Sequence, residues 1–102
     1  MYIVNINGEK CSVSFDFCDI PNENIEKWCN FQAKSLDTEK FYELQVTKYR
    51  NDDNYNFYIE VFKKIENEDY EGSWIKLEEF INNSQELEKI KEILITLSDE
   101  LN

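Results

Sequence analysis

The chain has 102 residues and a net charge of −11, from 22 acidic against 11 basic side chains, and it contains no histidine. This balance is the opposite of a basic nucleic-acid-binding surface, and it also disfavours contact with anionic membranes. The missing histidine removes the usual general base and the commonest metal ligand. We therefore expect neither direct nucleic-acid binding nor membrane association.

The length is that of one domain, residues 1–102, and 15 aromatic side chains provide material for a hydrophobic core. No apolar segment approaches the ~18 residues of a membrane span. The three cysteines, Cys11, Cys18 and Cys29, are odd in number and lack CxxC spacing, so no zinc site is indicated. Because no secretory signal is evident, we expect a cytoplasmic protein with reduced thiols that act as small core residues.

The first segments along the chain are typical of strands. Residues 2–7 alternate weakly, residues 11–17 alternate cleanly, and Gly8 lies in the short connection, which predicts a hairpin. The next segment, Asp19 to Asn22, has the residues of a helix start, with Pro21 suited to the first turn. Apolar residues then recur at helical spacing, which predicts a helix that ends between Lys34 and Asp37.

The centre of the chain, residues 41–65, predicts a second hairpin, because two alternating runs flank the polar residues 51–54. One face of this hairpin is apolar, and the other mixes aromatic and charged side chains. The expected register consists of three opposed pairs: Arg50 with Tyr55, Val46 with Ile59, and Leu44 with Val61.

The remaining segments predict a strand, a helical turn and a long helix. Residues 73–77 are expected to return beside residues 55–65, and residues 78–81 to form one helical turn. Asn83 and Glu86 resemble a capping box at the start of a helix over residues 84–101. Its apolar stripe includes Leu94, whereas Ile95 lies off the stripe and is expected to be exposed.

The sequence thus predicts an α+β domain of order ββαβββα, with an antiparallel sheet of about five strands and two helices packed on one face. The acidic clusters lie in expected loops and element ends, and no nucleophile has a base beside it. We therefore expect no enzyme, no catalytic residue, no cofactor and no metal site. A small enzyme or a regulatory metal binder is the remaining alternative of that class.

The candidate binding surface is the acidic stretch from Glu66 to Glu79, which combines six acids with two aromatic residues and only one lysine, Lys76. Aromatic side chains are common anchors of protein interfaces, and pooled carboxylates can imitate nucleic-acid phosphates. The alternative is a solvated loop beside a strand whose Trp74 faces the core. The eight candidate residues are Glu66, Glu68, Asp69, Tyr70, Glu71, Trp74, Glu78 and Glu79.

These features favour a small acidic inhibitor, encoded by a phage or mobile element, that binds a basic protein. The expected partner is a nucleic-acid-binding host defence nuclease, so the protein would be of anti-CRISPR or anti-restriction type. The alternative is an immunity protein or antitoxin that neutralises a cognate toxin. If the acidic stretch is not the contact surface, the mixed face of the central hairpin, around Tyr49, Tyr58 and Phe62, is the next candidate.

Overall fold

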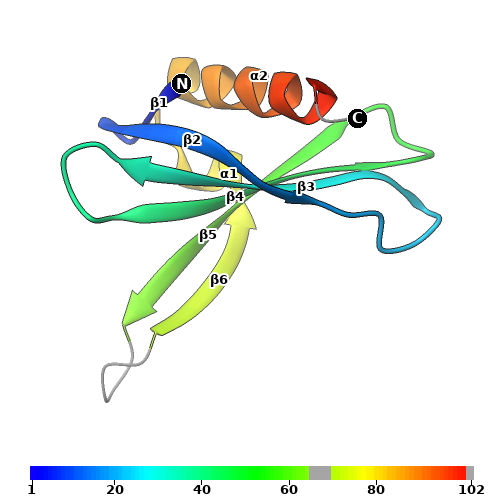
Figure 1. Cartoon of the computed structure of the whole chain (residues 1–102), viewed down its shortest axis with the longest axis horizontal. Helices are drawn as coiled ribbons and strands as arrows, with labels where there is room; N and C mark the ends of the chain where they lie inside the picture. The colour runs from blue at the N-terminus through cyan, green and yellow to red at the C-terminus, as the bar shows by residue number, and fades with distance from the viewer. Residues whose placement is uncertain (65–69, 101–102) are drawn as a thin grey trace.

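In the computed structural model of the protein, the backbone is described for residues 1–64 and 70–100, and the side chains for residues 1–61 and 72–100. Six strands form one antiparallel sheet in which every strand pairs with its neighbour in the sequence. Figure 1 shows a strongly twisted sheet with the long helix α2 along one side. The elements are β1 (Tyr2–Ile6), β2 (Glu9–Cys18), β3 (Ile25–Ser35), β4 (Phe41–Tyr49), β5 (Tyr55–Lys64), β6 (Tyr70–Lys76), α1 (Leu77–Phe80) and α2 (Ser84–Glu100).

The expected fold class is wrong, because the segment predicted as the first helix is the strand β3. Its inward-facing residues Cys29, Phe31 and Ala33 follow one another at a period of two, and each is completely buried. A strand with that period buries one whole side on the core. The sheet therefore has six strands in a simple up-and-down order, and the sequence ββαβββα does not describe it.

The residues that resembled a helix start form a turn between β2 and β3. The Asn22 side-chain oxygen accepts a hydrogen bond from the Asn24 amide (2.9 Å), and the Asp19 carboxylate accepts one from the Ile20 amide (2.7 Å). Side chains of Asn and Asp make such local hydrogen bonds in turns as readily as at helix N-termini. Asp19 and Asn22 therefore do accept backbone hydrogen bonds, but in a turn and not at the start of a helix.

The central hairpin is confirmed, but its predicted register is wrong by two residues. Leu44 pairs with Ile59, and Val46 pairs with Phe57. A contact outside the hairpin explains this shift in register. The Arg50 amide donates a hydrogen bond to the Asn24 carbonyl (3.0 Å). Arg50 is thereby held in the neighbouring loop and does not pair with β5. A shift of two residues preserves the alternation of faces, so the predicted apolar face still forms the core.

The predictions of the first hairpin, of the strand and helical turn after residue 70, and of the start of the last helix are confirmed. β1 and β2 form a hairpin whose turn residues, Asn7 and Gly8, both have positive φ angles (49° and 87°), as the Asn-Gly hairpin turn requires. β6 returns beside β5, and α1 is the expected helical turn. Asn83 caps α2, because its side-chain oxygen accepts hydrogen bonds from the amides of Gln85 (2.9 Å) and Glu86 (3.0 Å).

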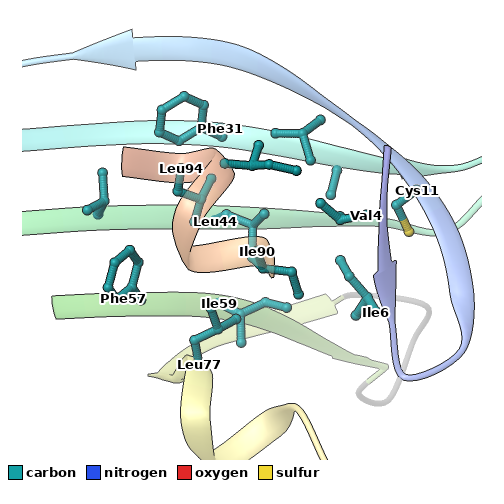
Figure 2. Packing of buried hydrophobic residues seen from close by; sticks show 14 of the residues in the cluster. Val4, Ile6, Cys11, Phe31, Leu44, Phe57, Ile59, Leu77, Ile90 and Leu94 are labelled. Atoms are coloured by element: carbon teal, nitrogen blue, oxygen red, sulfur yellow. The ribbon is translucent and has the colours of Figure 1, made fainter. Parts of the chain in front are cut away.

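The core lies between the sheet and α2 (Figure 2). Phe31, Leu44 and Ile59 project from the sheet, and Ile90 and Leu94 meet them from α2; all five are completely buried. Leu94 is therefore a core residue, as its place on the stripe predicts. In contrast, the expectation that Ile95 is exposed is wrong, because this side chain is half-buried and packs against the core. α2 therefore contacts the core through a wider face than the predicted apolar stripe alone.

The expectation of three reduced thiols is wrong for two of the cysteines. Cys18 and Cys29 lie directly opposite each other on β2 and β3, with their Cα atoms 4.1 Å apart, and they form a disulfide. Cys11 is a free thiol in the core, as expected. The bond depends on the pairing of β2 with β3, so a helix at this point would not allow it.

Candidate protein-binding face

One side of the sheet packs on α2, and within the described residues no helix covers the other side, which we call the open face. Two rows of directly opposed residues cross the open face from strand to strand. The first row is Ser14, Gln32, Glu43, Glu60 and Trp74. The second row is Phe17, Asn30, Gln45, Tyr58 and Lys76.

The middle of the open face is a hydrogen-bonded polar network. The Gln45 amide donates to the Asn30 side-chain oxygen (3.3 Å), and the Thr47 hydroxyl donates to the Gln45 side-chain oxygen (3.4 Å). Asn30 and Thr47 are only 9% and 5% exposed, although they lie on the uncovered side. Buried polar groups that are hydrogen-bonded to one another hold fixed positions. The network therefore provides a rigid floor for this surface.

An acidic pair, Glu43 and Glu60, lies beside this floor. The two residues are direct partners across β4 and β5, so their side chains project from adjacent positions on the open face. The Gln32 side-chain amide donates to one oxygen of Glu43 (3.1 Å), but the other oxygen, Oε2, is buried without a hydrogen-bond partner among the described residues. Burial raises the pKa of Glu43 above its ordinary value, and the charges of Asp16 and Glu60 add to this effect. Like charges that face each other directly across two strands destabilise a sheet.

A glycine on the neighbouring strand makes room for Glu60. A Cβ atom at Gly72 would lie 2.1 Å from Oε1 of Glu60, which is far inside van der Waals contact. Any other residue at this position would displace the carboxylate. The absence of a side chain at Gly72 therefore sets the position of the Glu60 carboxylate.

Aromatic side chains lie on the open face on both sides of the two strands that carry the acidic pair. A β-bulge between Phe15 and Phe17 turns Phe17 onto the open face, where its ring meets that of Trp28 edge to face at 5.7 Å. On the opposite side, Trp74 is the direct cross-strand partner of Glu60 and is 41% exposed. Exposed aromatic residues around a charged centre are typical of protein interfaces.

The structure places the residues of the predicted acidic stretch as follows. Glu66, Glu68 and Asp69 lie outside the described residues, as do the side chains of Tyr70 and Glu71. Trp74 lies exposed on the open face, so the alternative in which its ring faces the core is wrong. Glu78 and Glu79 are exposed on α1, on the other side of the sheet, where Phe80 packs against Tyr42 with ring centroids 6.0 Å apart. The described members of the stretch therefore do not form one surface.

The candidate residues that sequence reasoning missed are Glu43, Glu60, Phe17 and Trp28. The first two belong to the mixed face of the central hairpin, whose alternation of aromatic and charged residues was the available signal. Phe17 and Trp28 gave no such signal, because their contact requires both the bulge in β2 and the identity of β3 as a strand.

Comparisons of the chain with protein-family models, with curated proteins and with solved structures found no match. In the part of the chain that the structure describes, no helix is both long enough and apolar enough to cross a membrane. The same residues contain no group of three or more acidic or cysteine side chains arranged to hold a metal ion.

Proposed function

We propose that the protein is a non-catalytic inhibitor whose open face binds a basic surface of a nucleic-acid-binding enzyme. The observation that carries this proposal is the acidic pair. Among the described residues, Glu43 and Glu60 oppose each other without an ion-pair partner, and one oxygen of Glu43 is buried without a hydrogen-bond partner. A cationic side chain from a partner would satisfy that oxygen and relieve the repulsion. Charge-assisted hydrogen bonds of this kind are among the strongest in protein interfaces.

The other described charges do not neutralise this pair. The ion pairs in the described part of the chain join Lys27 to Asp99, Lys48 to Glu26 and Lys91 to Glu88. Neither Lys34 of β3 nor Lys76 of β6 makes an ion pair with Glu43 or Glu60. With a net charge of −11 over the whole chain, the surface is suited to a basic partner.

The spacing of the pair favours a partner that normally binds nucleic acid. Directly opposed residues on two strands have Cβ atoms about 4.5–5.5 Å apart, whereas alternate residues along one strand are ~6.6 Å apart. A cross-strand pair is therefore the closest arrangement of carboxylates that a sheet face offers, and it approaches the phosphate density of DNA more nearly than one strand does. The enzyme class that we propose is a host defence nuclease in the cytoplasm, and a nuclease toxin is the alternative partner.

The direct experiment is a set of cleavage assays with purified CRISPR effectors, restriction nucleases and nuclease toxins. We expect the protein to give saturable inhibition of at least one enzyme, and the double variant Glu43→Gln/Glu60→Gln to lose that inhibition. The matched control is Glu92→Gln/Glu100→Gln, which removes two exposed charges from α2 and should inhibit normally. Unchanged cleavage across the whole panel would contradict the proposal. Inhibition of a toxin encoded beside this gene would identify the protein as an immunity protein or antitoxin.

A further inference from the structure

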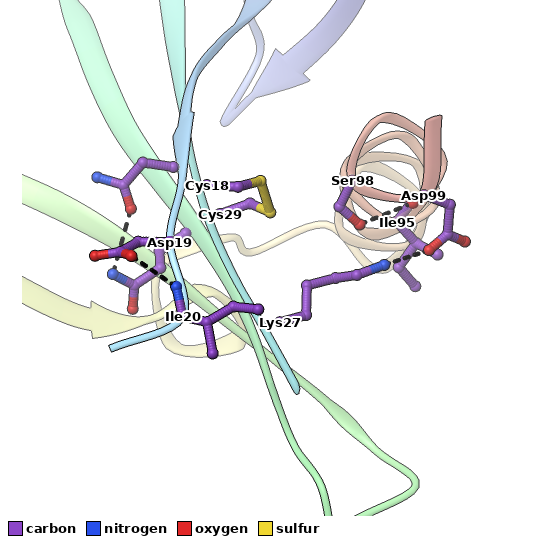
Figure 3. Close-up of a disulfide and its surroundings, with 10 residues drawn as sticks. Cys18, Asp19, Ile20, Lys27, Cys29, Ile95, Ser98 and Asp99 are labelled. Atoms are coloured by element: carbon purple, nitrogen blue, oxygen red, sulfur yellow. Dashed lines mark hydrogen bonds and ion pairs between the residues drawn. A yellow bond between two sulfur atoms is a disulfide. The ribbon is translucent and has the colours of Figure 1, made fainter. Parts of the chain in front are cut away.

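The Cys18–Cys29 disulfide joins β2 and β3 on the core side of the sheet (Figure 3), next to the two residues that form the aromatic pair of the open face. Phe17 immediately precedes Cys18 on β2, and Trp28 immediately precedes Cys29 on β3; their rings are in edge-to-face contact. Beyond the disulfide, the Asp19 amide donates a hydrogen bond to the Trp28 carbonyl (2.9 Å), and the turn to β3 follows. The disulfide is therefore the covalent link at the aromatic end of the hairpin.

The two strands are attached to the rest of the protein to different extents at this end. On β3, Cys29 is completely buried, and Lys27 forms an ion pair with Asp99 of α2. On β2, every residue from Ser14 to Cys18 is exposed, and the bulge interrupts the pairing with β3 after Phe15. Beyond the bulge, β2 is held by the pairing of Phe17 and Cys18 with β3, by the ring contact with Trp28 and by the disulfide. Because these residues are exposed, loss of the covalent bond should loosen β2 more than β3.

The third cysteine does not compete for the disulfide. Cys11 is completely buried, and burial raises the pKa of its thiol to about 11, with a further contribution from the charge of Glu9. The thiolate is the species that attacks a disulfide, and almost none forms at neutral pH. Cys11 also lies seven residues from Cys18 along the strand, a separation of ~23 Å. Exchange is therefore confined to the Cys18–Cys29 pair.

We propose that this disulfide is a redox-controlled clamp on the aromatic end of the open face. A dithiol reductant of the thioredoxin class supplies the two electrons and two protons. One of its thiolates attacks the exposed Cys18, and the Cys29 sulfur leaves and is protonated. The second thiol of the reductant then attacks the mixed disulfide, which releases the Cys18 thiol and leaves the reductant oxidised. In a reducing cytoplasm such bonds are usually transient and regulatory.

Release of the clamp changes the proposed binding face. In the oxidised protein, Phe17 is held against Trp28 on the open face, and in the reduced protein Phe17 is free to leave it. Only the consequence for partner binding rests on the proposed function. The clamp itself is a property of the isolated chain, so its test needs no partner.

The test compares hydrogen exchange of two amides before and after treatment with dithiothreitol under native conditions. Asp19 reports the clamped end of the β2–β3 pair, whereas Leu36, whose amide donates to the Lys10 carbonyl (2.9 Å), reports the opposite end. We expect exchange at Asp19 to accelerate by at least about tenfold on reduction, and exchange at Leu36 to change by less than about twofold. Cys18→Ser should reproduce the reduced pattern without reductant, and Cys11→Ala should keep the wild-type response.

A second readout uses fluorescence. In a Trp74→Phe background, Trp28 is the only tryptophan. Its emission should change on reduction, because the neighbouring disulfide is broken and Phe17 moves away from the indole ring. Three outcomes would overturn the clamp: resistance of the disulfide to dithiothreitol in the folded protein, unchanged protection of Asp19, or simultaneous loss of protection at both amides. The last result would mean that the bond supports the whole fold. Failure to inhibit any nuclease would leave these readouts unaffected.

Discussion

Glu43 and Glu60 face each other directly across β4 and β5, on the side of the sheet that α2 leaves uncovered. Two carboxylates at this position weaken the isolated protein, since like charges repel and Glu43 is partly desolvated. A sequence selected for stability alone would not retain such a pair. We infer that the pair serves a binding partner. The first prediction below measures the stability cost of the pair, and the second separates stability from binding.

Glu43→Gln should stabilise the protein at neutral pH by about 0.2–1 kcal/mol, because it removes a directly opposed like charge. The pKa of Glu43 is raised in the folded state, chiefly by burial, so the folded protein binds this proton more tightly than the unfolded chain does. The contribution of Glu43 to stability therefore falls as the pH rises above the ordinary carboxyl pKa of 4.5. Urea unfolding at several pH values should show that the free energy of unfolding of the variant exceeds that of the wild type above that pH. Below that pH the two values should become equal. Glu92→Gln is the exposed control, and an equal gain there would contradict the account.

Gly72→Ala should reduce inhibition while changing stability by less than about 1 kcal/mol. The added methyl group would occupy the place of the Glu60 carboxylate, which is the mobile end of a flexible side chain and can move aside at little cost. The measurement is inhibition of the partner together with thermal unfolding. Ser73→Ala, at the next position on the same strand, is the control and should inhibit normally. A large loss of stability in Gly72→Ala would show that the glycine is needed for the fold and not for the position of Glu60.

Leu94→Ala should cost roughly 2–5 kcal/mol of unfolding free energy, as truncation of a completely buried leucine usually does. Ile95→Ala should cost less, about 1 kcal/mol, because this side chain is only half-buried. Chemical denaturation of the two variants at one temperature measures both values. Equal losses of unfolding free energy at the two positions would mean that α2 packs against the sheet through a different face.

The helix α2 could be predicted from the sequence because its signals are local. Asn83 caps it through two adjacent amides, and the apolar stripe lies within the helix itself. The strand β3 could not be predicted in this way. Ile25 and Trp28 happen to follow helical spacing, and β3 is buried in part on both sides, so its alternation is incomplete. Its identity depends on pairing with β2 and β4, which are distant signals in the sequence.

The wrong hairpin register and the missed disulfide have the same origin as the error at β3. The hairpin register is set by the contact between Arg50 and Asn24, and Asn24 belongs to the turn that was expected to begin a helix. The disulfide requires Cys18 and Cys29 to face each other across two strands, and only one of these strands was predicted. For the binding surface, the alternating pattern of the central hairpin indicated a mixed face, but the position of the acidic pair on it required the register.

The central claim is that the acidic pair on the open face, rather than the exposed acids of α1, contacts the partner. The most direct test compares two double variants with the same change in charge, Glu43→Gln/Glu60→Gln and Glu78→Gln/Glu79→Gln, in titrations against an inhibited nuclease. We expect the first variant to raise the inhibition constant at least about thirty-fold, since a buried interfacial charge pair is worth roughly 2 kcal/mol or more. The second should raise it by less than about threefold, because Glu78 and Glu79 are exposed on α1, on the other side of the sheet, and contribute only to the overall charge. A large loss with Glu78→Gln/Glu79→Gln and none with Glu43→Gln/Glu60→Gln would contradict the account.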